Sequence, residues 1–401
     1  MQRVVDREIA PGVQYMRLRI DSYPLNVNML KVDLTNPGNR VETTVANESA
    51  KGTELLVNAS KRLAEAGKRP VAAANGNFWI VSSQTPDGKV FNGITRNASV
   101  RNGKMVTESN QYLDKWDKGT TRTGVVAISY DGTAYVDYCT SAIRVKVNDG
   151  DAFSVHQCNK GMQPGELCMY NSFYGRDRAF MPIRMNADKM YEIVDRGDAV
   201  EVLLDLKSGQ EWGGGRDIRF EVKEVRRNAG NGTLGNYDLA LVGRGRSYSD
   251  YKFKDIKPGD EVTLEYHWTF DPDGERICPD VEQAIGGNAL VMRHGELTEH
   301  NDNEDYNSMV YSRTGYGCSA DGKTLYIIVI DKSTDPVYGK SAGCNTAKMC
   351  EIARYFGCYN MANFDAGGSA EMMVDGAIVN TTTESTPRAV ANGLMIFSLT
   401  Q

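Results

Sequence analysis

The clearest pattern along the chain is the alternation of apolar and polar residues over short segments that end at turn residues. It is seen at residues 199–206 (A-V-E-V-L-L-D-L), 218–225 (I-R-F-E-V-K-E-V) and 261–268 (E-V-T-L-E-Y-H-W). A period of two places successive side chains on opposite faces, so these segments predict half-buried β-strands. The run L-Y-I-I-V-I at residues 325–330 is apolar throughout and predicts a fully buried strand.

Two segments have the 3.6-residue period of an amphipathic helix instead. They cover residues 53–67 and 345–357, and each ends at a glycine and is followed by a predicted strand. Each of these strands carries polar residues two apart near its end, Asn75 with Asn77 and Asn363 with Asp365. Because residues i and i+2 of a strand share a face, each pair projects to one side, and the two strand ends are a candidate place for a site.

Similar motifs recur in the two halves of the chain. Each half has an Asn-Gly or His-Gly turn followed by R-T-G, which opens a predicted β-hairpin with Asp-Gly at its tip. The corresponding residues are Arg101 and Arg293, Arg122 and Arg313, and Asp131 and Asp321. This internal repeat predicts two related halves that meet in one core.

The combined pattern predicts an α+β fold with a pseudo-duplicated mixed β-sheet core flanked by helices. Residues 1–139 and 276–401 are predicted to form one composite domain, in which residues 1–45 add an N-terminal β-hairpin extension. Residues 140–275 are rich in strand patterns and glycine connections and predict a β-rich inserted subdomain.

Charge and composition exclude several classes of function. The net charge of −6 offers no excess of Lys and Arg to neutralise phosphates, which argues against nucleic-acid partners. No apolar run approaches the roughly 18 residues of a membrane-spanning helix. The eight cysteines form no C-x-x-C pair, which argues against zinc-ribbon and thioredoxin sites and leaves both disulfides and buried free thiols open. The N-terminus, M-Q-R-V-V-D-R-E, has no apolar signal-peptide core, and we expect any export signal to have been removed.

The segment N-F-D-A-G-G-S at residues 363–369 is the strongest candidate for chemistry. Successive glycines permit positive φ, so backbone N–H groups can converge on an anion or a sugar oxygen. A carboxylate beside them, Asp365, can serve as base, nucleophile or metal ligand. The alternative is that the segment is only a turn between a strand and the hairpin that follows it.

Arginine and asparagine supply the other candidates. The planar fork of Arg suits bidentate phosphate recognition, although one Arg is more often paired with a carboxylate for structural reasons. N-G-N-F at residues 75–78 offers amides beside an aromatic ring, as sugar sites do, and is also common turn chemistry. Arg388 and Asn392 lie just before the last predicted strand.

Several well-known motifs are absent. There is no G-x-S-x-G, Walker A or dinucleotide fingerprint, and the four histidines are scattered. A metal site remains open, because Asp365, Asp331 and Glu371 could bind Ca²⁺ or Mg²⁺ through oxygen. Their spacing does not indicate a dedicated cage.

The ordered motifs resemble the phosphodiester glycosidase family. They are N-G-N-F, R-T-G, A-I-G-G, a second R-T-G, D-A-G-G-S and R-A-V-A-N, over residues 50–138 and 280–398. The family usually has D-G-G-G-S where Ala366 stands here, and small hydroxyl residues are common where this chain has Glu371. The resemblance implies a hydrolase outside the cytoplasm, periplasmic or extracellular, which removes a sugar from a phosphate joined to its anomeric carbon.

The resemblance also implies roles for the candidate residues. Asp365 would be the nucleophile or general base, with Glu371 and Arg313 beside it at the catalytic centre. Arg122 and Arg313 would clamp the phosphate, and Asn75 and Asn77 would hold sugar hydroxyls or an acetamido group. The remaining substrate-binding residues are Gly367, Gly368, Ser369, Arg388 and Asn392.

The substrate implied is a small or polymeric glycan phosphodiester, such as an N-acetylhexosamine-1-phosphodiester of a cell envelope. No cofactor is required by this reading, with Ca²⁺ or Mg²⁺ left open. Two alternatives are a non-catalytic periplasmic or cell-surface glycan-binding protein and a metal-dependent phosphodiesterase. The sequence predicts no oligomeric state.

Overall fold

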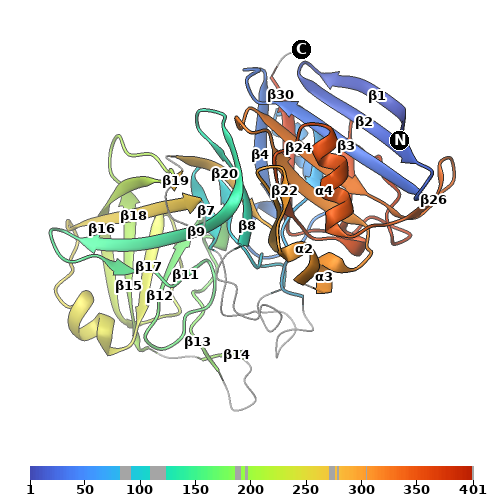
Figure 1. The fold of residues 1–401 in the computed structure, drawn as a ribbon. Coiled ribbons are helices and arrows are strands. Elements are labelled where there is room, and N and C mark those ends of the chain that lie inside the picture. The colour runs from blue at the N-terminus through green and yellow to red at the C-terminus, as the bar shows by residue number, and fades with distance from the viewer. Residues whose placement is uncertain are drawn as a thin grey trace.

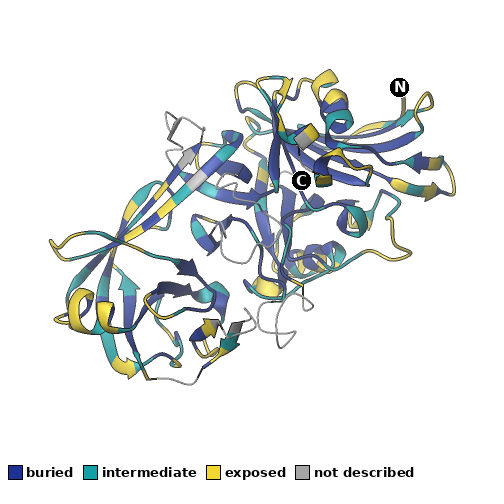
Figure 2. Cartoon of the chain, turned by 60° about the horizontal axis from the view of Figure 1, so that its bottom comes forward, coloured by how far each residue is buried: buried dark blue, intermediate teal, exposed yellow. Residues whose placement is uncertain are grey.

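The computed structural model describes residues 1–81, 92–108, 123–185, 191–194, 197–270, 276–277, 280–303 and 305–399. Figure 1 shows two lobes, one containing β1–β3, β24 and α4 and the other containing β15–β18. Buried residues are concentrated in the sheets of both lobes, whereas exposed residues lie mainly at turns and outer strands (Figure 2).

An eight-stranded antiparallel sheet forms one layer of the first lobe, in the order β1-β2-β3-β24-β23-β27-β21-β22. Its strands are β1 (Gln2–Ala10), β2 (Val13–Ile20), β3 (Leu25–Asp33), β21 (Ala289–Arg293), β22 (Glu296–Leu297), β23 (Arg313–Cys318), β24 (Thr324–Ile330) and β27 (Asn360–Asn363). The apolar run predicted as a buried strand is β24, which pairs with β3 on one side and β23 on the other. The N-terminal strands therefore extend this sheet.

A five-stranded sheet packs against the first, in the order β29-β28-β5-β30-β4. Its strands are β4 (Asn39–Val45), β5 (Pro70–Asn75), β28 (Met372–Val374), β29 (Ala377–Ile378) and β30 (Asn392–Ser398). The apolar core between the two sheets includes Leu30, Ile327 and Val329 from one and Ala72 and Ile396 from the other. Strand β27 thus belongs to one sheet and β28 to the other, so the chain between them crosses from sheet to sheet.

The described residues form four α-helices, which lie outside these sheets. They are α1 (Leu56–Glu65), α2 (His300–Asn303), α3 (Asp305–Ser308) and α4 (Thr346–Tyr355). Helix α1 packs on the five-stranded sheet through Leu56 and Leu63, and α4 packs on the eight-stranded sheet through Met349 and Ile352. Both ten-residue helices confirm the predicted helical segments.

The second lobe is a 13-stranded sheet. Its strands are β6 (Ser99–Arg101), β7 (Lys104–Thr107), β8 (Thr123–Ser129), β9 (Ala134–Val147), β10 (Phe153–Ser154), β11 (Gln157–Cys158), β12 (Leu167–Asn171), β15 (Ala199–Leu206), β16 (Arg216–Ala229), β17 (Leu239–Arg244), β18 (Glu261–Phe270), β19 (Arg276–Ile277) and β20 (Val281–Gly286). Two further hairpins complete the strands, β13 (Ile183–Met185) with β14 (Tyr191–Ile193) and β25 (Lys332–Asp335) with β26 (Gly339–Ala342).

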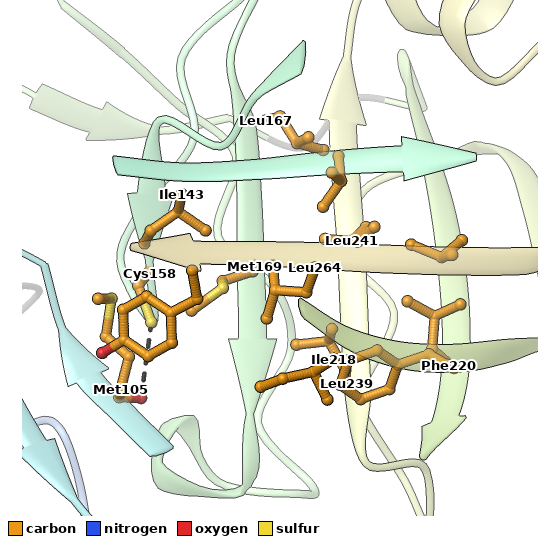
Figure 3. Close-up of a cluster of buried hydrophobic side chains, with 14 of the residues drawn as sticks. Met105, Ile143, Cys158, Leu167, Met169, Ile218, Phe220, Leu239, Leu241 and Leu264 are labelled. Carbon is orange, nitrogen blue, oxygen red and sulfur yellow. Dashed lines mark hydrogen bonds between the residues drawn. The ribbon is translucent and has the colours of Figure 1, made fainter. Parts of the chain in front are cut away.

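The second lobe has its own apolar core. Figure 3 shows Ile218, Phe220, Leu239, Leu241 and Leu264 gathered between its strands. Ile218, Phe220 and Leu264 come from two of the segments whose two-residue period predicted strands, and all three lie at buried apolar positions. The predicted boundary at residues 139 and 140 falls within β9, and the division into a composite domain and an insertion stays a prediction.

The predicted α+β class with flanking helices is wrong. Strands make up 50% of the structure and helices 12%, so the fold is β-rich with several sheets and few helices. The prediction assumed that the two clear helical segments represent layers of helices that cover the sheets. In the structure each covers part of one outer face, while sheet-on-sheet packing and a separate 13-stranded sheet bury most of the apolar side chains.

The hairpins expected after each R-T-G are present, as β8–β9 and β23–β24. That they descend from an internal repeat stays a prediction. The seven described cysteines are buried, and Cys278 lies outside the described residues. Within the residues of known placement, no helix has both the length and the apolar character needed to span a bilayer.

Candidate active site

The N-F-D-A-G-G-S segment is the crossing between the two sheets of the first lobe. Asp365 follows β27, Gly367–Ser369 form a 3-10 turn, and Glu371 immediately precedes β28. Gly367 has φ +63°, a conformation that favours glycine, and its N–H and C=O both bond Ser312. The segment is therefore a fixed turn with a carboxyl group on each side.

Asn75, at the end of β5, joins the two carboxyl-bearing residues. Its Nδ2 donates to the backbone oxygen of Asp365 at 2.8 Å, and its Oδ1 accepts the backbone N–H of Glu371 at 3.1 Å. The hydroxyl of Thr314 also donates to Oδ1. Asn75 is fully buried, so its amide holds the backbone of both acids instead of facing a sugar.

Asp365 has an altered protonation equilibrium. Burial raises its pKa to about 6, against the opposing effects of the Ser369 hydroxyl and the guanidinium groups of Arg388 and Arg96. A carboxyl with this pKa is mostly ionised at pH 7. The positive charges of Arg388 and Arg96 favour this ionised form.

Glu371 is the more unusual group. It is fully buried, and neither carboxyl oxygen has a hydrogen-bond partner among the described residues. Burial raises its pKa to about 8, with Arg388 as the opposing charge. The carboxyl is therefore mostly protonated at pH 7.

Arg388 lies over the glycine turn. Its Nη1 donates to Ser369 Oγ at 3.2 Å, and it forms an ion pair with Glu384, four residues earlier in the sequence. A Cβ at Gly368 would lie 2.3 Å from Arg388 Nη2 and 2.4 Å from Glu384 Oε1. Glycine at this position lets the guanidinium and the carboxylate lie directly against the backbone of the turn.

Arg313 was predicted to clamp the phosphate, but in the structure its guanidinium group bonds backbone carbonyls. It is fully buried, with Nε donating to the carbonyl of Cys344 at 3.1 Å and Nη2 to that of Tyr306 at 2.7 Å. Further carbonyls at Asn307 and Met309 accept from Nη2, while Nη1 has no hydrogen bond within the described part of the chain. Burial lowers its pKa. Arg313 thus fastens the 306–309 backbone; its predicted partner Arg122 lies outside the described residues.

We expect Arg313→Lys to lower the free energy of unfolding by about 3 kcal/mol, because one ammonium cannot replace a fork that serves several buried carbonyls. Denaturant unfolding monitored by tryptophan fluorescence measures this. The matched control is Arg246→Lys, since the Arg246 side chain is 92% exposed and should change stability by less than about 0.5 kcal/mol. Equal stabilities for both variants would contradict the structural role of Arg313.

The loop that Arg313 holds supplies an aromatic wall. Tyr306 packs edge-on against Phe78 with ring centroids 5.3 Å apart and stacks on Tyr311 at 5.5 Å. Burial, and then the Asp365 carboxylate, raise the pKa of Tyr306. Tyr306 therefore lies near Asp365 and connects the N-G-N-F segment to the glycine turn.

Asn77 and Asn392 form a separate buried pair. Asn392 Oδ1 accepts the Asn77 N–H at 2.8 Å, and Asn392 Nδ2 donates to Asn77 Oδ1 at 3.0 Å. Asn77 Nδ2 donates to the carbonyls of Asn97 and Ala98. Their amides are used within the protein, where they link the end of β5 to β30.

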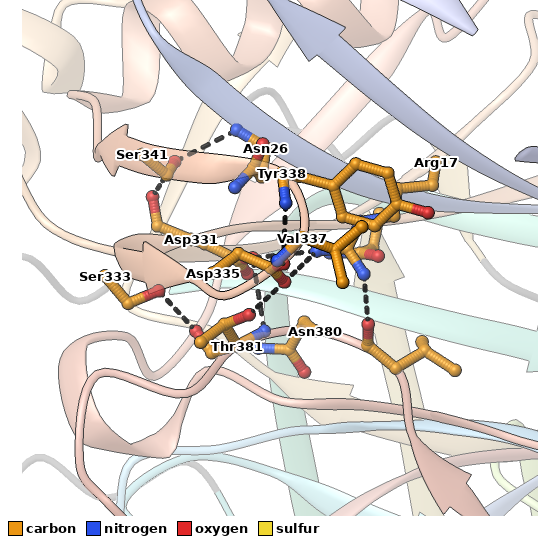
Figure 4. A network of polar contacts seen from close by, with 12 residues as sticks. Arg17, Asn26, Asp331, Ser333, Asp335, Val337, Tyr338, Ser341, Asn380 and Thr381 are labelled. Atoms are coloured by element: carbon orange, nitrogen blue, oxygen red, sulfur yellow. Dashed lines mark hydrogen bonds and ion pairs between the residues drawn. The ribbon is translucent and has the colours of Figure 1, made fainter. Parts of the chain in front are cut away.

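Asp331 belongs to a neighbouring polar network (Figure 4). It is buried 4.0 Å from Arg17, accepts the Thr381 N–H at 3.2 Å, and burial raises its pKa to about 7. Asn380, next in this network, donates to the Ala370 carbonyl at 3.0 Å and accepts the Met372 N–H at 2.8 Å. The network therefore holds the backbone on both sides of Glu371.

The described residues contain no group of three or more His, Cys, Asp or Glu side chains that could hold a metal ion. The oxygen ligands suggested by the sequence, Asp365, Asp331 and Glu371, are thus not gathered into one such group. A bound Ca²⁺ or Mg²⁺ stays a hypothesis, and no step below depends on it.

Three residues of this arrangement were missed by sequence reasoning: Arg96, Tyr306 and Glu384. Arg96 is held by its Nε on the Trp79 carbonyl at 3.5 Å, and no local pattern distinguishes it from other arginines. Tyr306 lies in a segment without periodicity. Glu384 lies in a segment that is neither helix nor strand, so its ion pair with Arg388 is seen only in the folded structure.

Comparison with known proteins supports the family resemblance over part of the chain. The sequence profile of the phosphodiester glycosidase family matches residues 222–397. The family resemblance is confirmed for this part of the chain. It includes the glycine turn, both carboxyl groups, Arg313 and Arg388, and it supports a hydrolase that acts on glycosyl phosphodiesters. No curated protein sequence matches the chain.

Solved structures show a similar fold. A hypothetical protein from Synechocystis matches with a TM-score of 0.63 at 15% identity, over 97% of this chain and 62% of its own length. This chain thus spans under two thirds of that protein. A putative exported protein from Burkholderia pseudomallei matches with a TM-score of 0.64 at 18% identity, over 93% of this chain and 74% of its own length. A third match is the catalytic domain of zebrafish N-acetylglucosamine-1-phosphodiester α-N-acetylglucosaminidase, auto-inhibited by its pro-peptide. Its TM-score is 0.44 at 13% identity, over 98% of this chain and 86% of that domain structure.

Proposed function

We propose that the protein hydrolyses a sugar-1-phosphodiester by breaking the bond between the anomeric carbon and the phosphate oxygen. The observation that carries this is the pair of carboxyls, Asp365 and Glu371, with pKa values raised to about 6 and about 8 and with backbones held by one Asn75 amide. Glycosidases use two carboxyl groups that differ in protonation at the working pH.

The two acids take different roles at neutral pH. Asp365 is ionised and acts at the anomeric carbon as nucleophile or as the base that activates water. Glu371 is protonated and donates to the leaving phosphate oxygen. Since a phosphate monoester leaves far more readily than a sugar alkoxide, this donation matters less than stabilising the oxocarbenium-like carbon and the departing charge.

Arg388 and Arg96 hold the phosphate in this proposal, in place of Arg122 and Arg313. Arg388 lies on the glycine turn through Ser369, and both arginines influence the Asp365 carboxyl. The backbone N–H of Gly368 adds a donor to the same anion, whereas those of Gly367 and Ser369 already bond the carbonyls of Ser312 and Ala366. Arg313 acts indirectly, by fixing the loop that carries Tyr306.

The sugar ring packs against Phe78 and Tyr306, which form an aromatic corner beside Asp365. We place an N-acetylhexosamine there, and the polymeric or small glycan beyond the phosphate extends toward solvent.

The location we propose for the protein is periplasmic or extracellular. Cell fractionation of the native source with an antibody measures the location, and a purely cytoplasmic signal would contradict it.

Hydrolysis in ¹⁸O-labelled water tests the function. Purified protein is incubated with N-acetylglucosamine-1-phosphate methyl ester, with and without EDTA, and the masses of the products are measured by mass spectrometry. We expect free sugar carrying the label, unlabelled methyl phosphate, and activity that survives EDTA. Label in the phosphate would indicate a phosphodiesterase instead. Binding of the ester without any product would indicate a glycan-binding protein.

A further inference from the structure

An acidic residue from a later segment lies against the glycine turn, although a phosphate-binding site does not need one. Glu384 forms an ion pair with Arg388, and its carboxylate lies against Gly368 on the same side of the turn as the guanidinium. Any phosphate that binds Arg388 and the turn must therefore lie beside a carboxylate. The substrate-binding roles given to the turn do not explain this negative charge.

We infer that Glu384 makes the site selective for phosphodiesters over phosphate monoesters. The inference rests on the proposed function, because it assigns the substrate phosphate to Arg388. Glu384 is a specificity-determining residue in this view and takes no part in bond breaking.

The charges around the turn support this selectivity. Arg388 and Arg96 bring two positive charges, whereas Glu384 and ionised Asp365 bring two negative ones. A phosphodiester carries one negative charge, and a phosphate monoester carries about 1.5 to 2 near pH 7. Since repulsion by Glu384 scales with the ligand charge, the monoester is penalised about twice as much on a logarithmic scale.

The same repulsion has a consequence for turnover. Hydrolysis of the glycosyl–phosphate bond converts a singly charged diester into a more highly charged monoester. The product is then less compatible with Glu384 than the substrate was. Glu384 therefore promotes release of the phosphate product as well as rejection of monoester sugars.

Binding of two simple anions tests the inference without any need for turnover. Diethyl phosphate represents the singly charged diester, and inorganic phosphate at pH 7.5 represents the mostly doubly charged monoester. Calorimetric titrations compare the wild type with Glu384→Gln, which keeps the size of the side chain and removes its charge. We expect affinity to rise about threefold for diethyl phosphate and about tenfold for inorganic phosphate.

Two further variants serve as controls. Asp250→Asn alters an exposed acid with the same four-residue spacing from its arginine, Arg246, and should leave both affinities unchanged. Arg388→Gln should weaken both anions, and unchanged binding in that variant would overturn the inference. Equal changes for the two anions in Glu384→Gln, or no binding of either to any variant, would overturn it too.

These outcomes separate the inference from the proposed function. An absence of hydrolysis together with the expected anion preference would refute the hydrolase while leaving the selectivity of the turn supported. Hydrolysis that proceeds normally while Glu384→Gln leaves the anion preference unchanged would overturn the selectivity alone.

Discussion

Asp365→Asn should reduce kcat for a sugar-1-phosphodiester by about a thousandfold or more, with the fold intact. Amide replacement keeps the size of the side chain and removes the negative charge that attacks the anomeric carbon or activates water. Folding should not suffer, because burial raises the pKa of Asp365 to about 6, and the ionised carboxylate therefore costs stability above that pH. The measurement is steady-state hydrolysis alongside thermal unfolding at pH 7.5.

The matched control is Asp375→Asn, ten residues further along the same chain segment. The Asp375 side chain is 51% exposed and pairs with Arg7 at the surface. Its φ of +50° is one that Asn also adopts readily, so the substitution should leave activity and stability unchanged. Retention of full activity in Asp365→Asn would remove this carboxyl from the mechanism.

Glu371→Gln should lower kcat about a hundredfold and remove a large pH dependence of stability. In the wild type, burial raises the pKa of this carboxyl from its ordinary 4.5 to about 8. The folded protein then holds a proton that the unfolded chain has lost, so stability from this group is complete below pH 4.5 and is lost progressively as pH rises toward 8. The amide has no proton to lose.

Chemical denaturation between pH 4 and pH 9 measures this effect. We expect the stability of the wild type to fall relative to that of Glu371→Gln over this range, by an amount on the order of 3 kcal/mol at pH 7. Glu351→Gln, at a half-exposed position on α4, is the control and should follow the wild type. Parallel curves for wild type and Glu371→Gln would show that this carboxyl has an ordinary pKa.

The same two groups predict a bell-shaped dependence of kcat on pH. Activity should rise as Asp365 ionises near pH 6 and fall as Glu371 loses its proton near pH 8. In Glu371→Gln the upper limb should disappear from the residual activity. Stopped assays across pH 4.5 to 9.5 with a buffer of constant ionic strength would reveal both limbs.

The elements that sequence reasoning predicted well are those set by local patterns. Strands with a two-residue period and the two amphipathic helices follow from the alternation of side chains around each segment, which needs no partner to be recognised. The proportion of the elements was wrong, because local patterns do not reveal that two sheets pack face to face and bury each other.

The site illustrates the same limit residue by residue. The glycine turn was recognised because its composition, Asp-Ala-Gly-Gly-Ser, is itself the signal. The roles of Arg313 and Asn75 depend on carbonyls and N–H groups contributed by other segments, and the structure shows both side chains occupied by them. Arg96 has no local mark that separates it from an ordinary surface arginine.

The order of residues alone therefore accounts for most strands, both longer helices and the chemical character of the turn at residues 363–369. The tertiary fold decides which arginines reach the two acids, and it creates the raised pKa of Glu371 by excluding water and partners from its carboxyl. The physical reason is distance: periodicity acts within a few residues, whereas burial and charge pairing depend on segments that are far apart in sequence and adjacent only after folding.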